Sequence, residues 1–295
     1  MLRLTAALLA TALCTATAAA AAPPDFAPTS SSGWFSYSRA FLPPPSGPGP
    51  VMQDPKYPLV TNDDFRATGR QPTYPIGDPT NPILQPWAAE SLRKVNAQTL
   101  SGKPIISQHA ECRPIGVTYF ILEPMTRPMF FVQGKNEVVM ILESFSDVRH
   151  IYLSDKHRAD LKPSWYGDSI GHYEGDTLVV DTVGFNDKTY IDGFHTPHTT
   201  KLHTVERFHL VDGGKELEVN VHVEDPGAFT TPWNAMQRYR QYELVARNAK
   251  ATGVQLAALA TPEEGPLNEA VCPDSPNSLM FIPGASIPQA RTPDF

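Results

Sequence analysis

Three histidines, His195, His198 and His203, fall within nine positions in the stretch FHTPHTTKLHTVE, and Glu206 follows closely after them. Imidazoles titrate near neutral pH and act as general acids, general bases or metal ligands. Their spacing is not the i, i+4 pattern that places two zinc ligands on one face of a helix. Three interpretations stay open: ordinary loop histidines, an acid–base pair at His198 and His203, or a three-histidine metal site.

Four charged residues lie on strand-like segments beside apolar neighbours. They are Glu143, Arg149, Asp181 and Glu206. Because side chains alternate along a strand, each shares a face with aliphatic or aromatic residues two positions away. If those faces line a barrel, the four side chains form an interior polar group. Buried charges must pair or be neutralised, so the group is either a structural Arg–carboxylate network or a cavity whose carboxylate moves protons.

The strongest candidates for catalysis are therefore His198, His203, Asp181 and Glu206. The candidates for substrate binding are Arg149, Glu143, Asp168, Asn186, Trp165 and Trp233. Asp168 belongs to the segment GDSIGHYEGD, which is interpreted as a loop with Gly-Asp turns. Its letters G-x-S-x-G fit a nucleophile elbow, but a strand-like run follows where that motif requires a helix, so a serine hydrolase is not favoured.

Short β-type runs separated by turn residues occupy the second half of the chain. They cover residues 117–122, 129–133, 137–143, 148–153, 176–185, 201–211, 216–223 and 238–247. The run ELEVNVHV alternates with Leu217, Val219, Val221 and Val223 on one face, as in an antiparallel strand with one wet side. The expected fold is mainly β: an antiparallel up-and-down barrel, lipocalin/calycin-like, with a β-sandwich as the alternative.

Two other segments complete the expected organisation. Residues 23–85 are rich in proline but carry aromatic residues, which predicts an extended arm lying on the domain; the alternative is a disordered leader. Pro86 begins a helical pattern that runs to about residue 98. We expect a barrel domain with this leading short helix over 86–260 and a C-terminal tail over 261–295.

Residues 1–22 have the pattern of a secretory signal peptide: Arg3, an apolar run too short to span a bilayer, and a run of small residues. Cys14 lacks the flanking residues typical of a lipidation box. The expected location is periplasmic or secreted. In such an oxidising compartment, Cys112 and Cys272 are most simply a disulfide that ties back the tail; two separate buried thiols are the alternative.

Charge and motifs limit the possible partners. The formal net charge is −7 and there is no run of Lys or Arg, so nucleic acid is not an expected partner. No apolar run beyond the signal is long enough to span a membrane. No Rossmann, P-loop or haem-attachment signature occurs, so no organic cofactor is expected.

Several long motifs resemble an uncharacterised family of exported bacterial proteins. The chain reads WYGDSIGHYEGDTLVVDTVGFNDKTYID, PHTTKLHTVERF and VEDPGAFTTPW, where the family reads close to SIGRWEGDTLVVDTVGFND, PHSDALHVTERF and DDPKAYTKPW. The resemblance covers roughly residues 84–247 and departs from the family's pattern at 149–156 and 272–276. It implies that Cys112 pairs with a late cysteine. It also implies that these residues hold the family's characteristic positions: Asp168, Glu174, Asp176, Asp181, Asn186, His198, His203, Glu206, Asp225 and Trp233.

Taken together, the sequence predicts an exported enzyme that acts on a small organic molecule by cofactor-independent acid–base chemistry, of lyase, isomerase or hydrolase type. A non-catalytic, lipocalin-like binder of apolar ligands is the second hypothesis. A metal-dependent protein with His195, His198 and His203 as ligands is the third.

Overall fold

The structure is a computed structural model that describes residues 22–27, 33–36, 40–105, 108, 113–122, 128–143 and 147–241. The predicted tail, both cysteines of the predicted disulfide and all but the last residue of the predicted signal peptide lie outside these ranges. The disulfide therefore stays a prediction.

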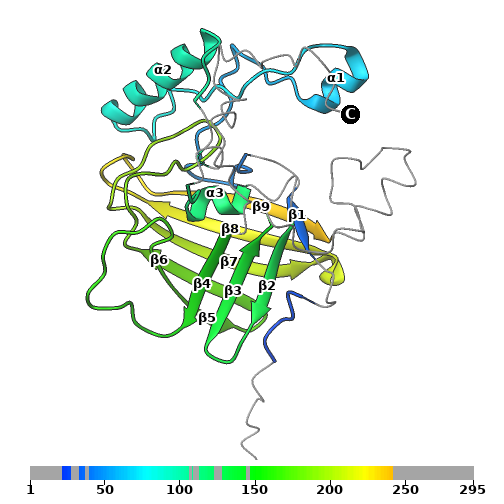
Figure 1. Cartoon of the computed structure of the whole chain (residues 1–295), viewed down its shortest axis with the longest axis vertical. Helices are drawn as coiled ribbons and strands as arrows, with labels where there is room; N and C mark the ends of the chain where they lie inside the picture. Colours follow the sequence, from blue (N-terminus) through cyan, green and yellow to red (C-terminus); the bar gives the residue numbers. More distant parts are fainter. Residues whose placement is uncertain are drawn as a thin grey trace, which may run out of the picture.

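Within the described residues, nine strands form one closed barrel in sequence order (Figure 1). They are β1 (Trp34–Ser36), β2 (Met129–Gln133), β3 (Glu137–Leu142), β4 (Asp147–Leu153), β5 (Asp168–Glu174), β6 (Thr177–Val183), β7 (His203–Val211), β8 (Glu216–Glu224) and β9 (Trp233–Gln241). The barrel closes because β1 pairs with both β2 and β9. The predicted mainly-β barrel is confirmed, and the sandwich alternative is excluded.

The barrel departs from an up-and-down topology at one place. β4 and β5 are parallel, with Ile151 opposite Ser169, whereas the other neighbouring pairs of the described barrel are antiparallel. Parallel neighbours need a connection that returns to the starting end. Residues 154–167 supply this return, and β5 itself follows in a segment that the sequence analysis interpreted as a loop.

Side chains alternate between the barrel interior and its outer surface, as strand geometry requires. On β8 the predicted apolar face, which includes Leu217 and Val221, is fully buried. On β3 the buried residues are Val138, Met140 and Leu142. The opposite face of β3, on which the sequence analysis placed Glu143, is therefore the outer one.

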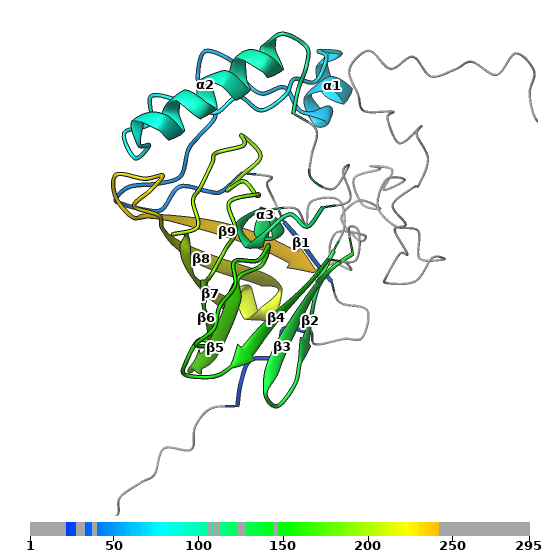
Figure 2. The ribbon, with the colours of Figure 1, turned by 60° about the vertical axis from the view of Figure 1, so that its left-hand side comes forward.

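Helix α3 (Val117–Leu122) packs against one end of the barrel (Figures 1 and 2). The sequence VTYFIL was predicted to be a strand because it is rich in β-branched and aromatic residues, and this prediction was wrong. As a helix it buries all of its side chains except Tyr119, so tertiary packing outweighs strand propensity. The Tyr239 hydroxyl donates to the Ile121 carbonyl at 2.7 Å and fastens the helix to β9.

Phe26 contacts strands β1 and β2 of the barrel. Its ring centroid lies 5.1 Å from that of Phe131, which lies 5.7 Å from that of Phe208. The Trp34 indole N–H donates to the Phe26 carbonyl at 2.7 Å. The proline-rich arm is thus built into the barrel at two points, by β1 and by this aromatic contact.

Two further helices lie beyond the end that α3 covers (Figure 2). α2 (Pro86–Leu100) confirms the predicted helix, with proline in its first turn and Ala88 and Leu92 buried. α1 (Asn62–Thr68) was not predicted. Its sequence signal is a capping box in which Thr61 and Asp64 each bond the other's backbone N–H.

Candidate functional site

A chain of acidic, imidazole and other polar side chains crosses the outer surface of the barrel. We call it the outer row, and its members in order are Arg158, Asp168, His157, Asp181, His203, Glu224, His222 and Asn234. Strand register explains why they meet, because His203 is paired with Glu224 and His222 with Asn234. Arg158 and His157 come from the return connection between β4 and β5, so the parallel pair is what adds them to the row.

The first half of the row is held by short hydrogen bonds. Arg158 Nε donates to Asp168 Oδ1 at 2.6 Å. His157 Nδ1 lies 2.9 Å from Asp168 Oδ2, and His157 Nε2 lies 2.9 Å from Asp181 Oδ1. Carboxylates only accept hydrogen bonds, so the two contacts favour the doubly protonated ring, in which each nitrogen of His157 donates to one carboxylate.

The second half of the row continues from the same Asp181 oxygen. His203 Nε2 lies 3.1 Å from Asp181 Oδ1, and His203 Nδ1 lies 3.6 Å from Glu224 Oε2. The other Glu224 oxygen lies 3.0 Å from His222 Nε2. Asp181 is consequently shared by the imidazoles of His157 and His203.

The directions in which the pKa values of His157 and Asp168 shift follow from these contacts. Partial burial lowers the pKa of His157, but the hydrogen bonds that its ring donates to Asp181 and Asp168 outweigh this effect and raise the pKa above its usual value. Burial raises the pKa of Asp168, and the bonds from His157 and Arg158 lower it overall. A raised histidine pKa adds stability that is fully present below the ordinary pKa of about 6.5 and is lost as pH rises through the folded value.

The members of the row differ in their exposure to solvent. Asp168 is 2% exposed, whereas 31% of the His203 side chain and 41% of the Asp181 side chain remain exposed. A solute molecule therefore has access to the Asp181–His203 contact from the solvent side.

Two members of the predicted interior polar group do meet inside the barrel. Arg149 Nη2 donates to Glu206 Oε2 at 2.7 Å and to Thr182 Oγ1 at 2.9 Å, and neither charged side chain is exposed to solvent. Burial raises the pKa of Glu206, while Arg149 opposes that rise. Glu143 is also buried, just beyond the end of β3.

The prediction that Asp181 belongs to this interior group was wrong. Asp181 shares a face with Val179 and Val183 as expected, but that face is the outer one, and Thr182 points inward instead. The run TLVVDTV does not indicate which of its two faces points into the barrel, because both faces carry valines. Val179 and Val180 lie on opposite faces, and both are buried. Asp181 and Glu206 are therefore on opposite sides of the barrel wall.

The other predicted histidines lie in the loop between β6 and β7, apart from the outer row. His198 is 4% exposed, and its Nδ1 lies 3.0 Å from the Thr199 carbonyl oxygen. Nδ1 must therefore carry the proton, so Nε2 accepts from the Thr189 hydroxyl at 2.7 Å. Burial lowers the pKa of His198 and lowers that of His195 to about 4.

The remaining predicted residues are not gathered at one site. The Trp233 ring is buried against Phe41 and Phe229, at centroid distances of 6.0 and 5.6 Å. Asn186 donates its backbone N–H to Ser164 and accepts from Lys188 through its side chain. Trp165 is half-buried in the return connection.

Sequence reasoning missed five members of the row. They are His157, Arg158, His222, Glu224 and Asn234. His222 and Glu224 alternate with the buried valines of β8, so strand periodicity contained the signal for their outward position. His157 and Arg158 lie in an irregular connection whose path depends on the parallel pairing, and no local pattern marks them.

Asp192 braces the β6–β7 loop and makes stability depend on pH. Its carboxylate is 2% exposed and accepts the backbone N–H groups of Phe194 and Thr196 and the Thr196 hydroxyl. Burial raises its pKa to about 6 despite these bonds. Because the unfolded value is about 3.9, the folded state binds the proton more tightly, and stability falls by roughly 3 kcal/mol as pH rises from about 4 to 6.

Asp192→Asn is expected to raise the free energy of unfolding at pH 7 by about 1–3 kcal/mol. The amide oxygen retains the two backbone bonds, and its NH₂ group can donate to the Thr196 hydroxyl. Urea unfolding between pH 4 and 8 measures this, with the exposed Asp176→Asn as control. A variant with the same pH slope and the same stability at pH 7 as the parent chain would contradict the assignment.

Among the described residues, no group of three or more His, Cys, Asp or Glu side chains is arranged to hold a metal ion. No helix in the described part of the chain is long and apolar enough to cross a membrane. Comparison of the chain with family models, curated proteins and solved structures gives no match. A function for this chain is therefore argued from the geometry of the outer row.

Proposed function

We propose that the protein is an exported enzyme that acts on a small organic molecule by acid–base chemistry at the outer row, without an organic cofactor. The observation that carries this proposal is the shared carboxylate of Asp181, within 3.1 Å of the Nε2 atoms of both His157 and His203. A carboxylate that orients an imidazole is a common device for proton transfer in enzymes.

His203 is proposed as the catalytic acid–base. A hydrogen bond from Nε2–H to Asp181 leaves the lone pair of the neutral imidazole on Nδ1. That atom lies 3.6 Å from Glu224, beyond normal hydrogen-bond length, so it can take a proton from a substrate or from water. Glu224 then stabilises the imidazolium that forms, and Asp181 keeps the ring in position.

The other charged groups are assigned supporting roles. His157 bonds Asp181 on one side and Asp168 on the other, and Arg158 bonds Asp168, so these groups are proposed to fix the position of the Asp181 carboxyl group. Arg149 and Glu206 are proposed as a structural pair, because both are fully buried and Arg149 also bonds Ser169 and Thr182. His198 is proposed to hold the β6–β7 loop through Thr189.

Three broader proposals accompany this one. A periplasmic or secreted location is supported by the signal-like residues 1–22. Kinship with the exported bacterial family is supported by the motifs quoted above. A lipocalin/calycin-like relationship is supported by the closed barrel, although the parallel β4–β5 pair is a departure from that type. A lumen binder of apolar ligands is less favoured, because the Arg149–Glu206 pair occupies the interior.

Asp181→Asn tests the proposal on any substrate found in a screen of small esters, lactones and compounds with an acidic C–H bond. We expect kcat/KM to fall by at least about tenfold, because the carboxyl group that orients the imidazole is replaced by an amide. Asp176→Asn, in the exposed β5–β6 turn, is the matched control. Equal losses of kcat/KM in Asp181→Asn and Asp176→Asn, or no loss in either variant, would contradict the proposal.

A further inference from the structure

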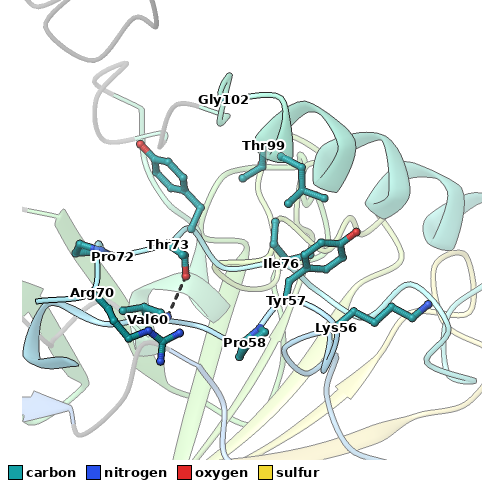
Figure 3. Close-up of a pocket in the computed structure, with 12 residues that line it drawn as sticks. Lys56, Tyr57, Pro58, Val60, Arg70, Pro72, Thr73, Ile76, Thr99 and Gly102 are labelled. Carbon is teal, nitrogen blue, oxygen red and sulfur yellow. Dashed lines mark hydrogen bonds between the residues drawn. The ribbon is translucent and has the colours of Figure 1, made fainter. Parts of the chain in front are cut away.

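A groove opens between the arm and the C-terminal end of α2, away from the outer row (Figure 3). One wall is formed by residues within 56–60 and 70–76 of the arm, and the other by Thr99, Leu100 and Gly102. Its volume is about 520 Å³, within the range of sites that bind small organic molecules. We call it the arm groove.

The arm groove has an apolar body made largely of exposed side chains. Tyr57, Tyr74 and Leu100 line it and are 42%, 59% and 50% exposed. Val60 and Ile76 form its buried floor. Large apolar side chains that gather around a hollow, instead of being scattered singly, are typical of a binding surface.

The charged side chains among the described lining residues of the arm groove are both positive. Lys56 and Arg70 line it, and Figure 3 places them on opposite sides of Tyr57. Neither forms an ion pair with a described residue, and no described lining residue is acidic, although Arg70 interacts electrostatically with Asp64 outside the lining. This is unusual on a chain whose formal net charge is −7.

The two tyrosine hydroxyls are also available. Within the described part of the chain, neither the Tyr57 nor the Tyr74 hydroxyl takes part in a hydrogen bond, whereas the lining Thr73 hydroxyl is used by the Val60 backbone N–H at 2.9 Å. A tyrosine ring offers an apolar face and a polar tip to the same ligand.

From these observations we propose that the arm groove binds a small aromatic carboxylate. The aromatic body lies against Tyr57, Tyr74 and Leu100, and the carboxylate is held by Arg70, with Lys56 adding positive charge. Guanidinium groups match carboxylates in both charge and geometry. This site is separate from the proposed acid–base function and does not depend on it.

The test measures binding of 2-naphthoate to the purified chain by isothermal titration calorimetry, beside the uncharged 2-naphthalenemethanol. We expect the carboxylate to bind at least about tenfold more tightly than the alcohol. Arg70→Gln should remove most of this preference, and Tyr57→Ala should weaken both ligands. Arg93→Gln, at an exposed arginine of α2 outside the groove, should change neither.

Each alternative result overturns the proposal. Equal affinity for the alcohol and the acid would leave only an apolar groove without anion recognition. Unchanged naphthoate affinity in Arg70→Gln and in Lys56→Gln would place the binding elsewhere. Absence of naphthoate binding at millimolar concentration would exclude an aromatic carboxylate site. The four substituted residues, Lys56, Tyr57, Arg70 and Arg93, are all exposed. Thermal melts of the variants should therefore match the parent chain and exclude misfolding as the cause.

Discussion

Arg149→Met is expected to lower the free energy of unfolding by about 3–5 kcal/mol. The Arg149 and Glu206 side chains are completely buried and 2.7 Å apart, inside a barrel whose neighbouring side chains are largely apolar. Removal of the guanidinium leaves a carboxyl group without its cation, and the Ser169 and Thr182 hydroxyls lose the same partner. Urea denaturation at pH 7 measures the loss.

Two further variants separate the cost of the orphaned carboxylate from the cost of changed packing. The double variant Arg149→Met/Glu206→Leu should recover most of the loss, because an apolar pair needs no desolvation of charge. Arg238→Met removes a comparable 2.7 Å contact to Glu218, but its arginine is 46% exposed, so a loss of less than about 1 kcal/mol is expected. Equal losses for Arg149→Met and Arg238→Met would contradict a structural role for the interior pair.

His203→Gln is expected to lower kcat/KM of the proposed acid–base reaction about 10²–10⁴-fold, the usual contribution of general acid–base catalysis. Glutamine can still donate a hydrogen bond to Asp181 but cannot act as a general base. The variant should therefore fold but turn over slowly across the whole pH range. A thermal melt and steady-state kinetics over pH 5–9 measure these two effects.

The matched control for this prediction is His172→Gln. His172 also lies on the outer surface and contacts a carboxylate, Glu174 at 3.0 Å, but it is not part of the outer row. Its replacement should leave turnover within about twofold, as expected for a surface substitution remote from the reacting atoms. Normal turnover by His203→Gln would remove His203 from the mechanism.

Part of the barrel could be predicted because its strands are short β-type runs separated by turn residues. On β8 polar and apolar residues alternate, so its buried face follows from the sequence, whereas on β3 a continuous apolar run has alternating burial that the residue types do not show. The prediction was wrong for two segments, for opposite reasons. Residues 117–122 have strand propensity but are helical where they pack on the barrel end, whereas residues 168–174 contain glycine and acidic residues but are held as β5 by their neighbours.

The candidate site was less predictable because it depends on which side of the barrel wall a residue faces. The sequence placed Asp181 and Glu206 on apolar faces, but only pairing in three dimensions shows that one face is outer and the other inner. Asp168, Asp181 and His203 do meet, as members of one row. Their link is His157, which comes from an irregular connection and is contributed by the one parallel pair in the described barrel.

The most direct test of the outer row is the pKa of His157, measured by NMR titration of its ring protons in the parent chain and in Asp181→Asn. The parent value should lie above the ordinary 6.5, and the variant should lower it, because Asp181 supplies one of the two hydrogen bonds that raise it. The raised pKa of His222, which depends on Glu224 and Asn234, should stay unchanged. A His157 pKa at or below 6.5 in the parent chain, or one that Asp181→Asn leaves unaltered, would contradict the shared carboxylate.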